Sequence, residues 1–388
     1  MKTSTKVLSA ILAMITLTSV GNSQNRGIVS IPLAEYRLNQ EMYGPLDRLC
    51  VRDGNVFFLI DQSIGNETIL PGFRYHTHDG TASTGANGEF HDCRETEEEL
   101  KTLTALYPGI ASFFTIGRSA EGRSINGIRI STRPESDQIP RIYILGSHHA
   151  REWISVEIPL DFARHLLESS ISNPEIRNCV QQAQIYIIPI VNPDGLEYSI
   201  YRYRYWRKNR RYNGDFAWGV DINRNYGYMW GFDDAGSSPD PRNSVFRGEK
   251  PFSEPETAAI RDFMLLHPPA GVISYHNYSQ TIIYPWGYTR NPATDDEEMK
   301  KLASEMSTYM ETVNGRKYSY GSSSEMLYLT NGDCTDWVYG EFGAIAFTIE
   351  LPPPSEIGHF FNSEEDIVPI CQENRLGLTT FIAHFTNR

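Results

Sequence analysis

The hydrophobic positions of this chain follow two alternating periods from about residue 95 to the carboxyl end. Six short runs rich in β-branched and aromatic residues predict buried strands. They lie at residues 113–116, 125–130, 142–145, 185–191, 272–275 and 344–351. Apolar positions at helical spacing predict helices at residues 97–107, 152–167, 253–267 and 295–313, and a last helix that ends near residue 385. Ser253-Glu-Pro-Glu256 predicts a capping box at the start of the third helix, and Asn-Pro-Asp-Gly (192–195) predicts a turn that ends the strand at 185–191. This alternation predicts an α/β fold: an α/β/α sandwich on a mixed, mostly parallel twisted sheet.

The amino end has a different pattern. Lys2 and Lys6 precede an apolar run at residues 7–20, which closes at the small residues Gly21 and Ser23. This order is typical of a secretory signal peptide, and the run is too short for a membrane anchor. We therefore expect a signal peptide at residues 1–23 and a secreted, extracellular protein without a membrane partner.

Two further segments follow the predicted signal peptide. Residues 24–93 form a short amino-terminal segment with one strand-like run at 51–60. This segment ends in a small, polar stretch at 80–88, which predicts a flexible linker. Residues 94–388 carry the regular alternation and are expected to form one large domain.

Composition excludes some partners. The chain has 388 residues, 40% of them hydrophobic, and a net charge of −13, which argues against nucleic acid or an anionic membrane as a partner. One basic, aromatic stretch at residues 201–211 is the local exception. Five cysteines suit an oxidising compartment and disulfide formation, but the odd number leaves at least one unpaired, and the pairing stays open. Asn66 lies in a glycosylation sequon.

The candidate chemistry lies where the predicted strand at 142–145 gives way to a helix. Open α/β sheets present ligands at such carboxyl ends of strands. His149 and Glu152 lie there, three residues apart, and can turn toward one cation such as zinc. His276 follows another predicted strand and is the candidate for a third ligand, although a lone histidine in such a place is more often a core or surface residue. The second His-x-x-Glu pair, His165 and Glu168, is interpreted as a solvated helix face.

Several motifs occur in one order along the chain. They are Gly-Ser-His-His-Ala-Arg-Glu-Trp-Ile (146–154), Asn-Pro-Asp-Gly (192–195), Trp-Arg-Lys (206–208), Val-Asp-Ile-Asn-Arg-Asn (220–225), His-Asn-Tyr-Ser-Gln (276–280), Tyr328, Asp336-Trp337 and Phe-Thr-Ile-Glu-Leu (347–351). Over about residues 90–388 the chain resembles the funnel-type metallocarboxypeptidases of the carboxypeptidase A and B family. The resemblance implies the zinc carboxypeptidase fold.

The resemblance also implies a role for each motif residue. One Zn²⁺ per chain is held by His149, Glu152 and His276, and Glu350 acts as general base and then general acid toward a zinc-activated water. Arg207 stabilises the oxyanion. The substrate is bound by Asn223 and Arg224, which clamp its terminal carboxylate, by Tyr328, which covers it, and by Arg151 and Tyr278 farther out. His148 has no such role and is interpreted as a bystander.

Selectivity and the rival functions depend on a few more residues. The pocket floor corresponds to Thr335, and Asp333 stands where glycine is usual, so we expect a mixed preference for apolar and basic C-terminal residues. The expected partners are peptides or proteins with a free C-terminal carboxylate, bound by a monomer. The family's propeptide is longer than residues 24–93, which leaves an atypical propeptide as one alternative. The rival functions are a catalytically inactive binding module and a zinc-dependent deacylase. An inactive module would be expected to have lost a zinc ligand or the base, and none is missing. A deacylase would not need the Asn-Arg clamp and Tyr328 together.

Overall fold

The computed structural model describes residues 26–32, 47–52, 55–61, 74–76, 87–353 and 360–386. The chain divides into two compact units, residues 1–85 with 199–205, and residues 86–198 with 206–388. The predicted signal peptide, the sequon at Asn66 and most of the predicted linker lie outside the described residues. In the described part, no helix is long and apolar enough to cross a membrane.

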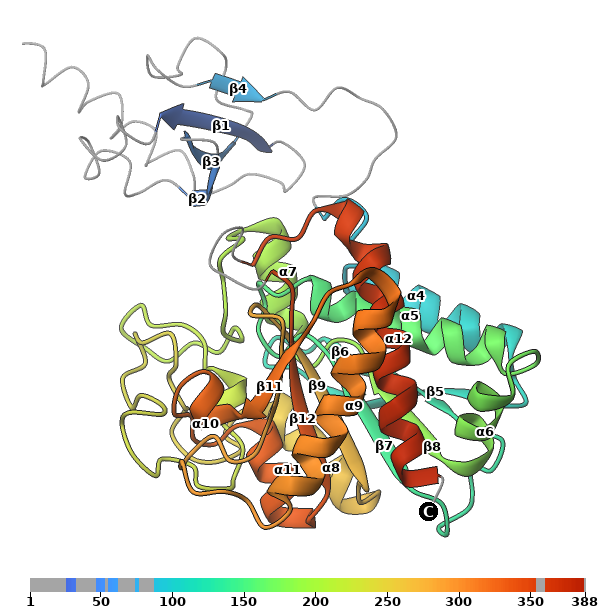
Figure 1. Ribbon diagram of the computed structural model, residues 1–388. Coiled ribbons are helices and arrows are strands. Elements are labelled where there is room, and N and C mark those ends of the chain that lie inside the picture. Colours follow the sequence, from blue (N-terminus) through green and yellow to red (C-terminus); the bar gives the residue numbers. More distant parts are fainter. Residues whose placement is uncertain are drawn as a thin grey trace, which may run out of the picture. The chain divides into compact units, whose positions relative to one another are not determined.

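The amino-terminal unit contains an antiparallel sheet in the order β2-β3-β1-β4 (Figure 1). Its strands are β1 (Arg26–Pro32), β2 (Asp47–Arg52), β3 (Asn55–Asp61) and β4 (Arg74–His76). The sequence predicted a single strand at 51–60, and this prediction was wrong: β2 and β3 are separate strands that pair with each other. The dipeptide Asp53-Gly54 between them is a hairpin signal that could have revealed the break.

The second unit is built on a mixed sheet of eight described strands, in the order β11-β10-β12-β9-β7-β8-β6-β5. The strands are β5 (Ala111–Arg118), β6 (Ser124–Ile130), β7 (Arg141–Leu145), β8 (Gln184–Ile188), β9 (Gly271–Asn277), β10 (Thr281–Tyr284), β11 (Ser319–Ser322) and β12 (Ile345–Leu351). The central neighbours β12, β9, β7 and β8 are parallel, whereas β5 and β6 are antiparallel. All six predicted strands occur, and β10 and β11 were not predicted.

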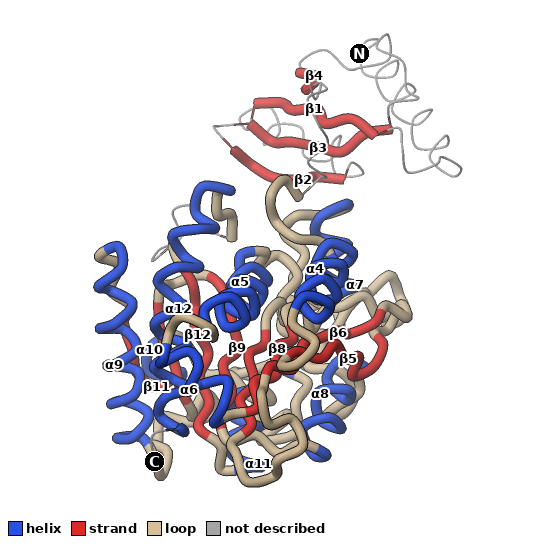
Figure 2. The backbone as a smooth tube through the Cα atoms, turned by 90° about the vertical axis from the view of Figure 1, so that its right-hand side faces the viewer, coloured by secondary structure: helices blue, strands red, loops and turns tan. Residues whose placement is uncertain are grey.

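Helices cover both faces of this sheet (Figure 2). One core cluster joins the sheet to α4 (Cys93–Leu106), α5 (Ile154–Ser169), α6 (Pro174–Gln182), α9 (Asp296–Asn314) and α12 (Glu364–Thr386). The other joins it to α8 (Pro255–Leu266) and α11 (Cys334–Phe342). Along β7, Ile142 and Ile144 lie in the first cluster and Tyr143 and Leu145 in the second, because successive strand residues point to opposite faces. The predicted α/β/α sandwich is thereby confirmed.

Two local predictions were wrong. Asn-Pro-Asp-Gly was expected to form a turn, but Pro193 begins a helix, α7 (Pro193–Tyr201). Asn192 precedes it, and its Oδ1 accepts a hydrogen bond from the Gly195 amide, so the Asn-Pro pair caps a helix. At α8 the expected capping box between Ser253 and Glu256 is absent, because residue 254 occupies the N-cap position and its side chain makes no capping bond.

The cysteines form no disulfide among those whose side chains are described. Cys93, Cys179, Cys334 and Cys371 are free thiols, and the last three are buried. Cys50 lies in β2, where the side chain is not described. The predicted disulfide is therefore not confirmed.

Candidate active site

Three predicted metal ligands meet at the ends of the neighbouring strands β7 and β9. His149 and Glu152 follow β7, and His276 lies near the end of β9. Glu152 Oε1 is 2.9 Å from His149 Nδ1, and Glu152 Oε2 is 3.0 Å from His276 Nδ1. The two Nδ1 atoms are 3.0 Å apart. All three side chains are buried, so the structure brings together residues that are 124 positions apart in the sequence (276 − 152).

The donor atoms of this cluster suit zinc. Two imidazole nitrogens and a carboxylate oxygen lie within 4.8 Å of one another, and two His with one Glu is a ligand set of catalytic zinc sites. Burial would raise the pKa of Glu152, but His149 and His276 hold the pKa below its ordinary value. The carboxylate therefore stays ionised, as a metal ligand must. The residues fit a single Zn²⁺.

The backbone before His149 makes a tight turn. Ser147 has φ 51°, in the left-handed region that favours glycine. Gly146 has no room for a side chain, because a Cβ there would lie 2.3 Å from the Ser155 carbonyl oxygen and 2.5 Å from that of Pro189. Ser147 thus occupies the position at which glycine would be less strained, and the chain reaches His149 directly from β7.

Asp221 supports this cluster, and its role was missed in the sequence. Its Oδ1 lies 3.2 Å from His149 Nε2, and its Oδ2 accepts a hydrogen bond of 2.9 Å from Arg207 Nε. Burial opposes the charge of Asp221, but Arg207 and His149 hold its pKa well below the usual range. A carboxylate on the outer nitrogen of a ligating histidine fixes the ring and its tautomer. Asp221 lies within the motif at 220–225, which gave its position but not its role.

The predicted base lies beside the ligands. Glu350 is at the end of β12, where it pairs in register with His276 of β9. Burial raises the pKa of Glu350 to about 8; the charge of Glu152 adds to the shift, and His276 and Arg207 oppose it. A carboxyl group with a pKa close to neutral can both accept and return a proton.

The predicted carboxylate clamp is held by hydrogen bonds. Asn223 Oδ1 accepts a hydrogen bond from the Cys334 amide at 2.9 Å. Arg224 is 2% exposed, and its guanidinium donates to the carbonyl oxygens of Gly236 at 3.0 Å and of Asn223 at 2.6 Å. Within the described ranges no carboxylate lies in ion-pair distance of Arg224. Burying a charge is costly without an opposite charge, so Arg224 lacks the anion that its position calls for.

The remaining predicted substrate residues lie in different surroundings. Tyr328 is exposed, and its role as a cover for the substrate stays a prediction. The Arg151 guanidinium lies 3.7 Å from the ring centroid of Phe360, and the rings of Tyr278 and Phe360 are 5.0 Å apart. The structure therefore groups Arg151 and Tyr278 through Phe360. No motif in the sequence indicated Phe360.

Asp333 does not face solvent. It is the N-cap of α11, and its Oδ1 accepts hydrogen bonds from the Asp336 amide at 2.9 Å and from Thr335 Oγ1 at 3.0 Å. Its Oδ2 accepts one from Thr330 at 2.7 Å. Burial, with the charge of Asp333, raises the pKa of Asp336 well above its usual value. All donors in these bonds to Asp333 are uncharged.

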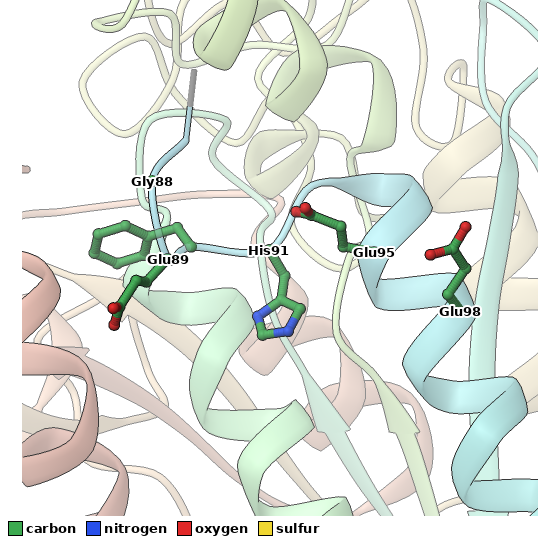
Figure 3. A pocket seen from close by; sticks show the side chains of 6 residues that line it. Gly88, Glu89, His91, Glu95 and Glu98 are labelled. Atoms are coloured by element: carbon green, nitrogen blue, oxygen red, sulfur yellow. The ribbon is translucent and has the colours of Figure 1, made fainter. Parts of the chain in front are cut away.

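A surface hollow lies apart from these residues, at the start of α4 (Figure 3). It is lined by Gly88, Glu89, Phe90, His91, Glu95 and Glu98. None of the predicted site residues lines it, so the hollow is not part of the candidate active site.

Comparisons with known proteins agree with this geometry. Residues 96–377 match the model of the zinc carboxypeptidase family. Mouse carboxypeptidase A1 is 33% identical over 297 residues, which cover 76% of this chain and 70% of the relative. Carboxypeptidase B of Astacus astacus is 33% identical over 302 residues, with 76% and 96% covered. The structure of bovine thrombin-activatable fibrinolysis inhibitor, in complex with tick carboxypeptidase inhibitor, superposes with a TM-score of 0.70 at 30% identity, covering 77% of this chain and 98% of that one.

The family match spans well over half of the chain, and three residues that can hold a metal ion are gathered at the strand ends. The relatives are carboxypeptidases of both the A and the B type. The chain therefore belongs to the zinc carboxypeptidase family and is a zinc-dependent metallocarboxypeptidase.

Proposed function

We propose that this enzyme removes single residues from the C-terminus of peptides and proteins, and that Arg224 and Asn223 bind the terminal carboxylate. The observation that carries this proposal is the buried guanidinium of Arg224, which bonds to backbone carbonyls and has no carboxylate partner in the described part of the chain. A planar guanidinium binds a carboxylate through two parallel hydrogen bonds. The free end of a peptide supplies the missing anion.

The catalytic roles follow from the groups around the cluster. His149, Glu152 and His276 would hold Zn²⁺, which would supply the polarisation of a carbonyl and a water molecule whose pKa is lowered from ~15.7 toward ~7. Glu350 takes a proton from the attacking water and passes it to the amide nitrogen as the C–N bond breaks. Arg207 donates to the oxygen on which negative charge develops. Asp221 holds Arg207 in place, with an Nη2–Oδ2 distance of 2.8 Å.

A mixed preference for the C-terminal residue is supported by two features of the predicted pocket. Thr335, the predicted pocket floor, is uncharged, and its Oγ1 lies 3.5 Å from Thr348 Oγ1. Because the floor carries no charge, an apolar C-terminal side chain can bind there through burial alone. Asp333 is a buried carboxylate, and its hydrogen-bond donors among the described residues are all uncharged. A lysine or arginine end would supply the opposite charge, and an acidic end would be repelled.

The biological setting is inferred from the amino end. The signal-like pattern of residues 1–23 supports secretion. Residues 24–93 would then precede a catalytic domain at 94–388, as a short amino-terminal segment or an atypical propeptide. We propose a monomer that acts on extracellular peptides.

The clamp is tested by comparing two peptides that differ only at the C-terminal group, a free carboxylate or an amide. In Arg224→Ala, kcat/KM for the free-ended peptide should fall by a factor equivalent to roughly 2–5 kcal/mol. Cleavage of the amide should change little. Arg247→Ala is the matched control, because Arg247 pairs with Asp234 instead of a ligand. Equal losses on both peptides would mean that Arg224 serves structure.

The same assay separates the rival functions. An inactive binding module would bind the free-ended peptide without releasing a residue. A deacylase would release acyl groups and leave peptide ends intact. If the last residue is released from the free-ended peptide and not from the amidated one, both rival functions are contradicted.

A further inference from the structure

His148 is fully buried next to the ligand His149, and both of its ring nitrogens have partners. Its Nε2 lies 2.8 Å from the hydroxyl oxygen of Tyr226, and its Nδ1 lies 3.1 Å from Ser274 Oγ. Ser274 Oγ is also 3.1 Å from Nε2 of the ligand His276. Ser274 and His276 are two residues apart on β9 and so share one face of the strand. A continuous network of hydrogen-bonded side chains therefore runs from Tyr226 to His276.

The direction of each hydrogen bond in this network follows from the metal site. His276 Nδ1 faces Glu152 and His149, so Nδ1 must be free of hydrogen to bind a cation, and Nε2 carries the hydrogen. Nε2–H then donates to Ser274 Oγ, and the Ser274 hydroxyl donates to His148 Nδ1. His148 in turn carries its hydrogen on Nε2 and donates it to Tyr226. One set of tautomers satisfies every group.

The far end of this hydrogen-bonded network lies against α11. The ring of Tyr226 stacks on that of Trp337, with the ring centroids 5.3 Å apart. The Cys334 amide of the same helix donates to Asn223 of the clamp. The network thus extends from a metal ligand to a side chain that packs on α11.

We propose that Ser274, His148 and Tyr226 form a hydrogen-bonded relay that positions His276 for zinc. They are positioning residues, because they act through His276 and not on the substrate. The two histidine ligands are then supported differently: His149 by the carboxylate of Asp221, and His276 by a hydroxyl and a neutral imidazole. Residues that support a ligand in this way typically change metal affinity by 10–100-fold. The inference rests on the proposed ligand set.

The test is the zinc dissociation constant of the purified full chain, measured by competition with a chromophoric chelator. Ser274→Ala should weaken zinc binding about 10–100-fold, and Tyr226→Phe should weaken it less. Ser274→Thr retains the hydroxyl and should restore affinity. The visible spectrum of the cobalt-substituted protein should change in Ser274→Ala, because the ring of His276 is no longer fixed.

Two matched controls lie on the α9–α12 side of the sheet. Ser307 Oγ donates to the Tyr318 carbonyl at 2.6 Å, and the Tyr318 hydroxyl donates to Glu373 at 2.6 Å. Ser307→Ala removes one buried hydrogen bond, and Tyr318→Phe removes the bond to Glu373 and a longer one of 3.4 Å from Asn374 Nδ2. Both variants should leave zinc affinity unchanged. If Ser274→Ala does not fold, Ser274→Thr and Tyr226→Phe carry the comparison.

Two results would overturn the relay. One is wild-type zinc affinity in both Ser274→Ala and Tyr226→Phe, and the other is an equal loss in the two controls. A failure of the ligand set itself is distinguishable. His276→Ala would then retain one zinc per chain, whereas failure of the relay alone leaves His276→Ala without zinc.

Discussion

Ser147 shows how one residue sets the approach to the metal site. Its backbone is in the left-handed region, which costs a non-glycine residue about 1–2 kcal/mol, and its buried Oγ makes no hydrogen bond to the described residues. Glycine would remove this strain and lose about 0.5–1 kcal/mol in unfolded-state entropy. The sequence showed the Gly-Ser-His-His order but not which residue makes the turn.

Ser147→Gly should therefore stabilise the protein by up to about 1 kcal/mol, measured as the free energy of unfolding in denaturant. The control is Ser304→Gly, in the interior of α9, where the same change should cost roughly 0.5 kcal/mol. A loss of similar size at both positions would mean that the left-handed turn carries no strain.

Asp333 combines two functions that the sequence could not separate. It caps α11, and its carboxylate is buried beside the predicted pocket. A glycine at this position would remove both the cap and the charge. Asparagine keeps one oxygen for the Asp336 amide and Thr335, and it removes the charge together with the second oxygen, which accepts from Thr330.

For Asp333→Asn we expect kcat/KM on peptides ending in Lys or Arg to fall by ~1–3 kcal/mol, a lost charge-assisted contact. Peptides ending in Phe or Leu should change much less. The measurement is a panel of peptides that differ only in the last residue. If the basic and apolar ends fall alike, Asp333 serves the helix and the pocket is selective for apolar residues.

His91 lies just before α4 and contacts carboxylates of two helices, α4 and α5. Its Nδ1 donates to Glu157 of α5 at 2.7 Å, and its Nε2 lies 3.1 Å from Glu99 of α4, which also contacts Arg164. Burial lowers the pKa of His91, but the two carboxylates outweigh it and raise the pKa to about 10. Because this value exceeds the unfolded value near 6.5, the contact stabilises the fold fully below pH 6.5. This contribution is lost as the pH rises through 10.

His91→Gln should accordingly destabilise the protein most below pH 6.5, and the difference from wild type should shrink toward pH 10. The measurement is the free energy of unfolding as a function of pH. His165→Gln is the control with the opposite trend, because burial and the charge of Arg375 lower the pKa of His165. The stability that neutral His165 contributes is lost as the pH falls. A pH-independent difference for His91→Gln would contradict the ion-pair account.

The elements that the sequence predicted correctly are those whose burial leaves a clear pattern. Central strands such as β7 and β12 are buried on both faces and therefore read as continuous apolar runs. Local details that depend on tertiary contacts were predicted wrongly. At α8, the Glu254 side chain accepts hydrogen bonds from Asn209 and Arg211, and the capping box predicted at Ser253 does not form.

In the candidate site as well, some residues could be predicted from the sequence and others depend on tertiary contacts. The motifs gave the positions of His149, Glu152 and His276, because their spacing and strand ends are visible in sequence. The supporting roles of Asp221 and His148 are set by contacts across 72 and 78 positions, and no periodicity reports such contacts. His148, interpreted as a bystander, is part of the hydrogen-bonded network in the structure.

In the second unit, the candidate active site lies at the carboxyl ends of central strands of a sheet that has a separate core on each face. The parallel strands β7, β9 and β12 end together, and they deliver the ligands and Glu350 from different parts of the chain. The activity therefore depends on the assembled sheet and not on any one segment.

The most direct test of this account is the turnover and zinc content of Glu350→Gln beside wild type, on a peptide with a free C-terminus. Wild type should release the last residue. The variant should hold the same zinc per chain but lose at least ~10²-fold in kcat, because the amide cannot accept the proton. Wild-type turnover in Glu350→Gln with zinc bound would contradict the central claim that Glu350 is the base of a zinc carboxypeptidase.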